Sequence, residues 1–313
     1  MHFYDCHCHL GGYIPPSFVW ETISKAGRYD IAPSLEAVQR HMTFSDQEPR
    51  SFYGFLEKFR ILDRIEWTED LIDGSIKSVC DEIKKHNIRY SWMRFSVNKY
   101  LERIKWDSVK AIRFIEEAFR RHAPGKVGLI LALKYESDRD NQRALAKLIE
   151  QSAIQDVVIG IDLVGDEAFF DAGFYRDIFQ AWKRNNKLLC AHVGESQSAE
   201  NVREAINFGV QRIAHGIKII DQPDILQLAM DKYVGFDMAL SSNYLTGVWT
   251  HSTEHPVSYF LRKGLDVTIG TDDPVQCSTT LAREYALASS LGLSDEEIVQ
   301  LQKNALKAVT RSW

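Results

Sequence analysis

Histidine and aspartate side chains recur at the ends of short apolar runs along this chain of 313 residues. The set comprises His7 and His9 in "DCHCHL" (5–10), His192, His215, and the neighbouring pair Asp272 and Asp273. Neutral imidazoles together with one carboxylate suit Zn²⁺, with Fe²⁺ and Mn²⁺ as alternatives. If the fold brings these run ends together, the sequence predicts one metal site.

The first segment also offers two cysteines, which alternate with the histidines. In a strand, residues two apart share a face, so Asp5, His7 and His9 are expected to point one way and Cys6 and Cys8 the other. The later runs end in histidines and aspartates, and none has a cysteine at a comparable position. This favours the histidine pair as ligands. The two cysteines are expected to face surrounding helices as small buried hydrophobes.

Further groups near these residues could act on a substrate. Glu195 follows His192 by three residues in "HVGE", where a carboxyl could donate a proton or could be an exposed turn residue. His215 could be another ligand or a base that orients a metal-bound water. Neighbours on a strand face opposite ways, so one of Asp272 and Asp273 can bind the metal while the other faces the substrate. Gly165 would let a planar ligand approach the backbone N–H.

Eight apolar runs separated by helix-like stretches make up most of the chain. The runs cover residues 2–10, 88–96, 126–135, 156–165, 187–195, 210–217, 233–240 and 266–274. Most of them lack clean alternation, as expected for parallel strands covered on both faces. This pattern predicts a (β/α)8 TIM barrel, in which the carboxyl ends of the strands converge on one mouth.

The interval between the first two runs, about residues 11–87, is much longer than one crossover helix requires. We expect an enlarged helical insertion that serves as a lid or specificity element of a single domain spanning residues 1–313. Within it, "SFYGFLEKFRIL" (51–62) predicts one amphipathic helix with Phe55 and Phe59 on one face. These rings either pack the insertion onto the barrel or roof the pocket.

Composition narrows the class of protein. The net charge of −5 and the lack of a basic stripe argue against a nucleic-acid partner. Five cysteines without a C-x-x-C pair favour a reducing compartment. The start "MHFYDCHCHLGG" lacks the features of a leader, and no apolar run is long enough to span a bilayer, so we expect a cytoplasmic protein without a membrane partner.

The motifs taken together resemble those of the adenosine deaminases, which belong to the metal-dependent amidohydrolase superfamily. The matching segments, in order, are "HCHLGG", "RFS", "IDLVGDE", "HVGES", "RIAHGI", "SSNYLTGVWTHSTEH" and "GTDDP". Each segment alone is common, whereas the ordered combination of H-x-H, H-x-G-E, H-G and T-D-D-P is specific. The resemblance runs from about residue 4 to the end of the chain.

This resemblance implies one catalytic Zn²⁺ per chain and a small-molecule purine substrate. The implied ligands are His7, His9, His192 and Asp272. Asp272 and His215 would orient a metal-activated hydroxide and take its proton. A protonated Glu195 would bind N1 of a 6-aminopurine, Asp273 would lie near N7 and the Gly165 N–H near N3. His9 would also border the substrate, and Phe55 and Phe59 match the apolar lid of the family.

One departure bears on the substrate. Nucleoside-deaminating members carry an acidic residue after "HxHL" that holds the ribose 5′-hydroxyl, and this chain has Gly11 there. Adenine-specific relatives also carry an acid there. Gly11 therefore favours a modified adenosine, with little adenosine activity, and deamination of adenine is a further alternative. A TatD-type metal nuclease shares a similar start but lacks "HVGE", and a catalytically silent binding protein would not need an intact ligand set. The oligomeric state is left open.

Overall fold

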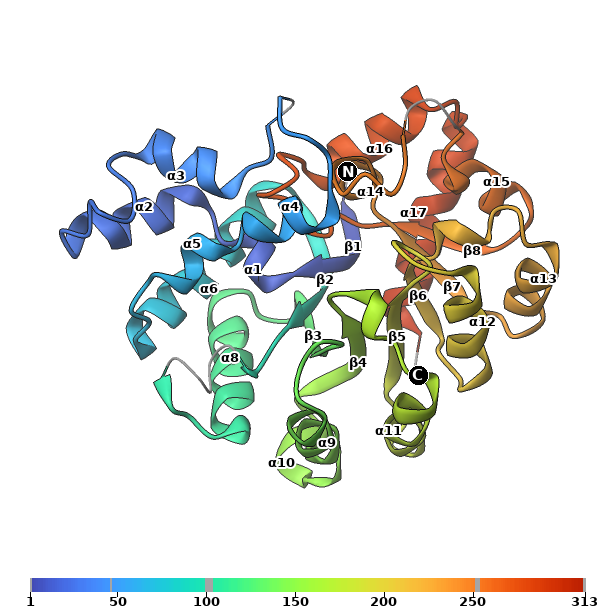
Figure 1. The fold of residues 1–313 in the computed structure, drawn as a ribbon, viewed down its shortest axis with the longest axis horizontal. Helices are drawn as coiled ribbons and strands as arrows, with labels where there is room; N and C mark the ends of the chain where they lie inside the picture. The colour runs from blue at the N-terminus through green and yellow to red at the C-terminus, as the bar shows by residue number, and fades with distance from the viewer. Residues whose placement is uncertain (1, 46, 99–103, 251–253, 312–313) are drawn as a thin grey trace.

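The structure, a computed structural model, describes residues 2–45, 47–98, 104–250 and 254–311. Residues 251–253 of the "SSNYLTGVWTHSTEH" segment therefore lie outside the described residues. Eight parallel strands follow one another around a barrel in chain order (Figure 1). They are β1 (Phe3–His9), β2 (Ile88–Phe95), β3 (Val127–Lys134), β4 (Val158–Val164), β5 (Leu188–Val193), β6 (Arg212–His215), β7 (Gly235–Met238) and β8 (Asp266–Ile269). The predicted (β/α)8 barrel is confirmed, and each of the eight predicted runs contains one strand.

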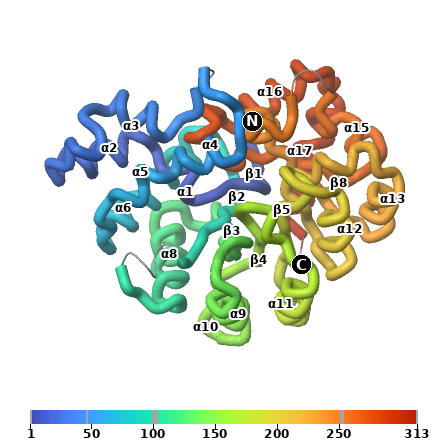
Figure 2. Tube along the Cα trace, in the orientation of Figure 1, coloured from blue at the N-terminus to red at the C-terminus, as the bar shows by residue number. Residues whose placement is uncertain are grey.

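Helices surround this sheet, and the colour in Figure 2 runs once around the ring from the N-terminal to the C-terminal part of the chain. The insertion after β1 holds α1 (Leu10–Tyr13), α2 (Pro16–Lys25), α3 (Leu35–Met42), α4 (Phe52–Glu57), α5 (Arg60–Asp63) and α6 (Glu69–Lys85). The later helices are α8 (Ser108–His122), α9 (Arg139–Lys147), α10 (Ser152–Gln155), α11 (Ala172–Arg184), α12 (Ala199–Asn207), α13 (Pro223–Asp231), α14 (Leu240–Leu245), α15 (Pro256–Arg262), α16 (Leu281–Ser290) and α17 (Asp295–Thr310).

The strands are buried on both faces, which explains their poorly alternating sequences. Their outer faces join the helices in one large apolar cluster that also includes residues of the insertion, such as Val19, Val38 and Ile61. The inner face carries ion pairs as well as apolar side chains. Arg94 Nε lies 2.6 Å from Asp162 Oδ2, and Arg212 Nη2 lies 2.6 Å from Asp237 Oδ1, all four residues being fully buried.

A β-bulge in β1 changes the expected alternation of side chains. Tyr4 pairs with Tyr90 and His9 with Arg94, but the register shifts between Asp5 and Cys8. One extra residue in β1 puts both Cys6 and His7 on the inner face. Cys6 packs inside the barrel with Trp92, Ile130, Leu188 and Cys190, so the prediction that it shares the outer face with Cys8 was wrong. Its Sγ also lies 3.7 Å from Ala305 O of α17, so the expected contact with a helix is present. Cys8 lies on the outer face, as expected, beside Met93.

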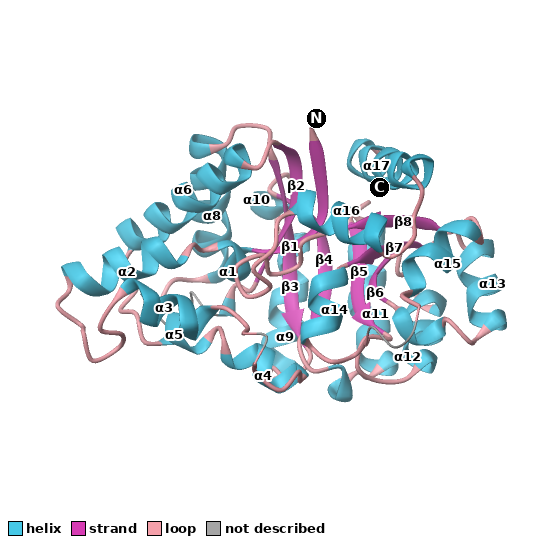
Figure 3. Cartoon of the chain, turned by 90° about the horizontal axis from the view of Figure 1, so that it is seen from above, coloured by secondary structure: helices cyan, strands magenta, loops and turns pink. Residues whose placement is uncertain are grey.

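The insertion extends to one side of the barrel, and α4 lies near the carboxyl ends of the strands (Figures 1 and 3). The predicted single helix over 51–62 is instead two short helices, α4 and α5. The break falls at Lys58 and Phe59, whose N–H groups bond to carbonyls three residues back, Phe55 O at 3.1 Å and Leu56 O at 3.2 Å. This tighter turn interrupts the α-helical ladder. Phe55 and Phe59 still contact each other, with ring centroids 6.1 Å apart.

Candidate active site

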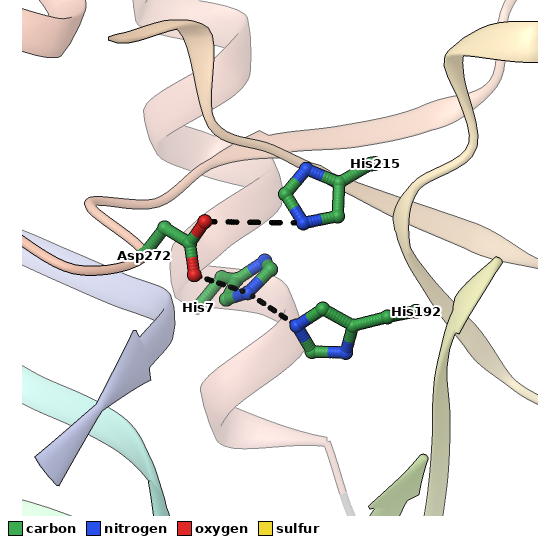
Figure 4. Close-up of side chains that lie close together, drawn as sticks. All are labelled: His7, His192, His215 and Asp272. Carbon is green, nitrogen blue, oxygen red and sulfur yellow. Dashed lines mark hydrogen bonds and ion pairs between the residues drawn. The ribbon is translucent and has the colours of Figure 1, made fainter. Parts of the chain in front are cut away.

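Side chains from three distant parts of the chain meet at the carboxyl ends of the strands (Figure 4). His7 and His9 end β1, His192 lies in β5, and Asp272 follows β8. His192 Nε2 is 3.1 Å from His7 Nε2 and 3.2 Å from His9 Nε2. Asp272 Oδ1 is 3.3 Å from His7 Nε2 and 3.2 Å from His9 Nε2. Three imidazole nitrogens and a carboxylate oxygen thus converge on one point.

These separations fit the edges of a tetrahedral zinc site. Ligand atoms at 2.0–2.1 Å from Zn²⁺ in a tetrahedral arrangement lie about 3.3 Å apart. The distances from the His192 and Asp272 donor atoms to those of His7 and His9, 3.1–3.3 Å, match that spacing. His215 is also close, and its donor nitrogen lies within 4.8 Å of those of His7, His192 and Asp272. However, His215 Nε2 is 3.9 Å from Asp272 Oδ2, which is longer than a tetrahedral edge and puts His215 outside this group of four.

A buried carboxylate orients one of the four side chains. His192 Nδ1 donates to Asp162 Oδ1 at 3.1 Å, and the other carboxylate oxygen of Asp162 binds Arg94. With its proton on Nδ1, His192 presents an unprotonated Nε2 to the site, which is the form that binds a metal. Asp162 was not among the residues predicted from the sequence, although it stands in the quoted "IDLVGDE" motif.

Burial keeps His7 and His215 neutral. Removal from water, together with the positive charge of Arg94, lowers the pKa of His7 to about 3. Burial also holds the pKa of His215 well below its usual value, although the nearby Asp272 carboxylate opposes this effect. Neutral imidazoles at neutral pH are ready to coordinate a cation.

The backbone is unusual at two of these positions. His215 has φ of 65° and Asp272 has φ of 57°, both in the left-handed region that non-glycine residues seldom adopt. Each lies at or just after the end of a short strand, where the chain turns its side chain toward the barrel axis. Such conformations persist where the surrounding structure enforces them, and they concentrate at functional sites.

Glu195 lies in a loop held by a second buried carboxylate. Glu167 accepts hydrogen bonds from the backbone N–H groups of residues 194–197 at 2.6–3.1 Å. This nest fixes the loop after β5, so Glu195 reaches toward the site, with Oε2 3.7 Å from His215 Nε2. Burial raises the pKa of Glu195 well above its usual value, and the charges of Asp272, Glu167 and Asp273 raise it further. Glu167 is a second positioning residue that the sequence analysis missed.

A cavity of about 460 Å³ opens above these groups. The predicted residues that line it are His9, Phe55, Phe59, Gly165, His192, Glu195, His215, Asp272 and Asp273, and His7 lies fully buried beneath them. Gly165 has φ of 94°, and a Cβ there would come within 2.3 Å of Glu136 Oε2, so only glycine fits. A Cβ on Gly12 would meet Asp273 Oδ1 at 2.0 Å, so the α1 backbone packs directly against this carboxylate.

A parallel eight-stranded barrel with three histidines and an aspartate gathered at its mouth defines an amidohydrolase-type enzyme. The chain belongs to the adenosine deaminase family, whose model matches residues 4–312. It is therefore a hydrolase of a metal-dependent class. The family relationship predicted from the ordered motifs is confirmed.

Similar proteins cover nearly the whole chain. The adenosine deaminase of Enterococcus faecalis is 26% identical over 96% of this chain and 90% of its own length. That of Aliivibrio fischeri (strain MJ11) is 28% identical over 96% of this chain and 91% of its own length. Among solved structures, the adenine deaminase of Arthrobacter aurescens has a TM-score of 0.85 at 19% identity, covering 99% of this chain and 94% of its own. The N6-mAMP deaminase of Arabidopsis has a TM-score of 0.84 at 21% identity, covering 98% and 92%.

Two further findings concern the metal of a similar protein and the possibility of a membrane-spanning helix. An amidohydrolase of B. ambifaria that was solved with bound Zn has a TM-score of 0.86 at 20% identity, covering 98% of this chain and 85% of its own. Among the described residues, no helix combines the length and the apolar composition needed to cross a membrane.

Proposed function

We propose that the protein is a zinc-dependent deaminase that hydrolyses the 6-amino group of an adenine nucleoside to give the 6-oxopurine and ammonia. The observation that carries this proposal is the spacing of the four donor atoms of His7, His9, His192 and Asp272, 3.1–3.3 Å, beside a buried carboxyl group. Family membership supports the reaction, and the zinc-bound relative supports the metal.

The proposed mechanism assigns a task to each side chain around the substrate. When bound, the zinc ion supplies a Lewis acid that makes a water molecule nucleophilic at neutral pH. Asp272 and His215 hold that water beside C6 of the purine, and its proton passes to Asp272. Glu195, kept protonated by burial, delivers a proton to N1 as the water oxygen attacks C6. The proton held by Asp272 then passes to the amino nitrogen, the C6–N bond breaks to release ammonia, and the proton of the C6 hydroxyl returns to Glu195 as the carbonyl forms.

The same proposal places the rest of the purine in the cavity. Asp273 lies toward N7 and the Gly165 N–H toward N3, which fixes the ring plane. The insertion of residues 11–87 acts as the lid, with Phe55 and Phe59 covering the base. Tyr53 of α4 donates to Asp166 Oδ2 at 2.8 Å, so the lid is tied to the loop that follows β4.

Ammonia release from a panel of purines tests the proposal. The zinc-loaded enzyme is incubated with adenine, adenosine, 2′-deoxyadenosine, AMP and N6-substituted purines, and Glu195→Gln serves as the matched inactive control. The adenine and N6-mAMP deaminases among the similar structures are the reason for including the free base and the N6-substituted nucleotides. Failure to release ammonia from every 6-aminopurine would refute the proposal, and cleavage of a DNA substrate would favour a nuclease instead.

Gly11 points to substrates with a modified 5′ position. It lines the cavity, and a Cβ at this position would contact only the Phe59 ring, at 3.8 Å, so a side chain would fit. No carboxylate at this position grips a 5′-hydroxyl, a charge-assisted bond worth about 1.5–3 kcal/mol. We therefore expect inefficient adenosine deamination and tolerance of 5′-modified nucleosides. Gly11→Asp should raise kcat/KM for adenosine relative to a 5′-deoxy analogue, and an unchanged ratio would contradict this assignment.

A further inference from the structure

A chain of three buried polar groups lies behind His215. Asn243 Nδ2 is 2.9 Å from His215 Nδ1, and Asn243 Oδ1 is 3.3 Å from His255 Nε2. The backbone N–H of Val257 donates to His255 Nδ1 at 3.1 Å. Asn243 belongs to α14, whereas His255 precedes α15, and both side chains are inaccessible to solvent. Neither residue has a role in the mechanism above.

The backbone N–H of Val257 determines which nitrogen carries the proton at each step of this series of hydrogen bonds. A backbone N–H can only donate, so His255 Nδ1 must accept and carries no proton. The His255 proton then sits on Nε2 and is donated to Asn243, so the Asn243 atom that faces His255 is the carbonyl oxygen. The Asn243 amide group therefore faces His215 and donates to Nδ1. His215 Nδ1 accepts, and the single proton of its neutral ring sits on Nε2.

We infer that Asn243 and His255 are positioning residues that hold His215 as its Nε2–H tautomer, so that His215 donates a hydrogen bond into the active site and is not the base. Nε2 of His215 faces Glu195 Oε2 at 3.7 Å and Asp272 Oδ2 at 3.9 Å. The acceptor for the proton of the attacking water is then Asp272. This catalytic role rests on the proposed function, whereas the tautomer itself does not.

The surroundings support a fixed arrangement of this chain. Burial lowers the pKa of His255 to about 3, so its ring stays neutral and Nδ1 stays free to accept. The Trp249 ring packs edge-on against His255, with centroids 4.9 Å apart, and the backbone N–H of Trp249 donates to the backbone carbonyl of Asn243 at 3.0 Å. His215 has a left-handed backbone, so the hydrogen bond from Asn243 sets the ring orientation where strand geometry does not.

Nitrogen NMR of the zinc-loaded enzyme with ¹⁵N-labelled histidine measures the tautomer directly. We expect His215, assigned by loss of its signals in His215→Asn, to show an unprotonated Nδ1 and a protonated Nε2. In Asn243→Asp, the carboxylate accepts a hydrogen bond, so a proton should move to His215 Nδ1. A wild-type spectrum with the proton on His215 Nδ1 would overturn the inference, whether or not any purine is deaminated.

Kinetics on the best substrate of the panel supply the second measurement. Asn243→Asp should lower kcat by about 10²-fold or more, with KM and zinc content close to wild type, since the proton donor has been lost from the site. His255→Gln keeps an N–H that can reach Asn243 Oδ1 and should retain most of the activity. His255→Phe removes that donor and should lower kcat by about tenfold. Wild-type kcat in Asn243→Asp, or equal loss in the Gln and Phe variants, would show that the two residues only fill space.

Discussion

Glu195 owes its expected reactivity to its surroundings. It is buried, and three carboxylates lie around it, so its pKa is raised well above the usual range, which favours the protonated form. Glu195→Gln keeps the shape but cannot deliver the proton. We expect this variant to retain zinc and to lose about 10²–10⁴-fold in kcat. Glu200→Gln, on the exposed side of α12, is the matched control and should match wild type in the ammonia assay. Near-normal kcat in Glu195→Gln would remove Glu195 from the mechanism.

Zinc content distinguishes the four proposed metal ligands from His215. Removing one of four ligands opens the coordination shell, so Asp272→Ala, His192→Ala, His7→Ala and His9→Ala should each bind little zinc. His215→Ala should keep its zinc, because its nitrogen lies outside the tetrahedral spacing. Cys8→Ala, equally buried on the other face of β1, is the control. Elemental analysis of the purified variants measures the zinc content of each. If His9→Ala retained full zinc and His215→Ala lost it, His215 would be the ligand and His9 would not.

At this scale the sequence indicates the residues proposed to touch the metal or the substrate better than it indicates the residues that position them. His7, His192 and Asp272 stand at the ends of apolar runs, and a barrel brings such ends together. Asp162 and Asn243 act through hydrogen bonds to ring nitrogens on other strands or loops. Their partners depend on strand register and loop conformation, which a single sequence does not specify.

At the scale of elements, the order of strands follows from the sequence but local irregularities do not. All eight strands lie inside the predicted runs, because buried parallel strands require continuous apolar segments. The bulge in β1 depends on pairing with β2, so the sequence alone predicted the wrong face for Cys6. The division of residues 51–62 into α4 and α5 likewise reflects packing of the insertion against the barrel and not helical periodicity.

The lid provides a prediction at this scale. Phe59 is partly exposed and lines the cavity, whereas Phe55 is buried and its ring also contacts Phe44, with centroids 6.4 Å apart. Phe59→Ala should raise KM by about tenfold through lost apolar contact, with zinc content unchanged. Phe55→Ala should raise KM and also lower the free energy of unfolding by about 3–5 kcal/mol. Phe169→Ala, at a side chain that is 59% exposed, is the control.

Steady-state kinetics and denaturant unfolding separate the two effects in the lid variants. If both retain the wild-type KM and lose only stability, the rings merely pack the insertion onto the barrel, and the lid assignment is wrong.

At the scale of the whole molecule, the proposed metal site lies at the junction between β1 and the segment that follows β8, where the barrel closes. This junction is called the seam below. Within the part of the chain that the structure describes, no strand pairing joins β1 to β8, and a single bridge pairs Cys8 of β1 with Asp272, which follows β8. Its bonds run from His9 N to Asp272 O at 2.9 Å and from Asp272 N to His7 O at 2.8 Å. Three of the four proposed ligands lie in these two short segments, and His192 joins them to the opposite side of the barrel. A bound cation would therefore link the two ends of the sheet.

Removing the metal should loosen this seam more than the rest of the barrel. Chelation leaves three imidazole nitrogens and a carboxylate converging without a cation. If free zinc is present at about 1,000 times its Kd, its removal lowers the free energy of unfolding by about 4 kcal/mol, or Tm by roughly 5–10 °C. Amide hydrogen exchange should speed up in β1 and in residues 270–273, while the β3–β4 pair, far along the sheet from the seam, serves as the internal control. Restoring zinc should reverse both changes. An equal increase of exchange in all strands would mean that the metal stabilises the fold as a whole and does not hold the seam.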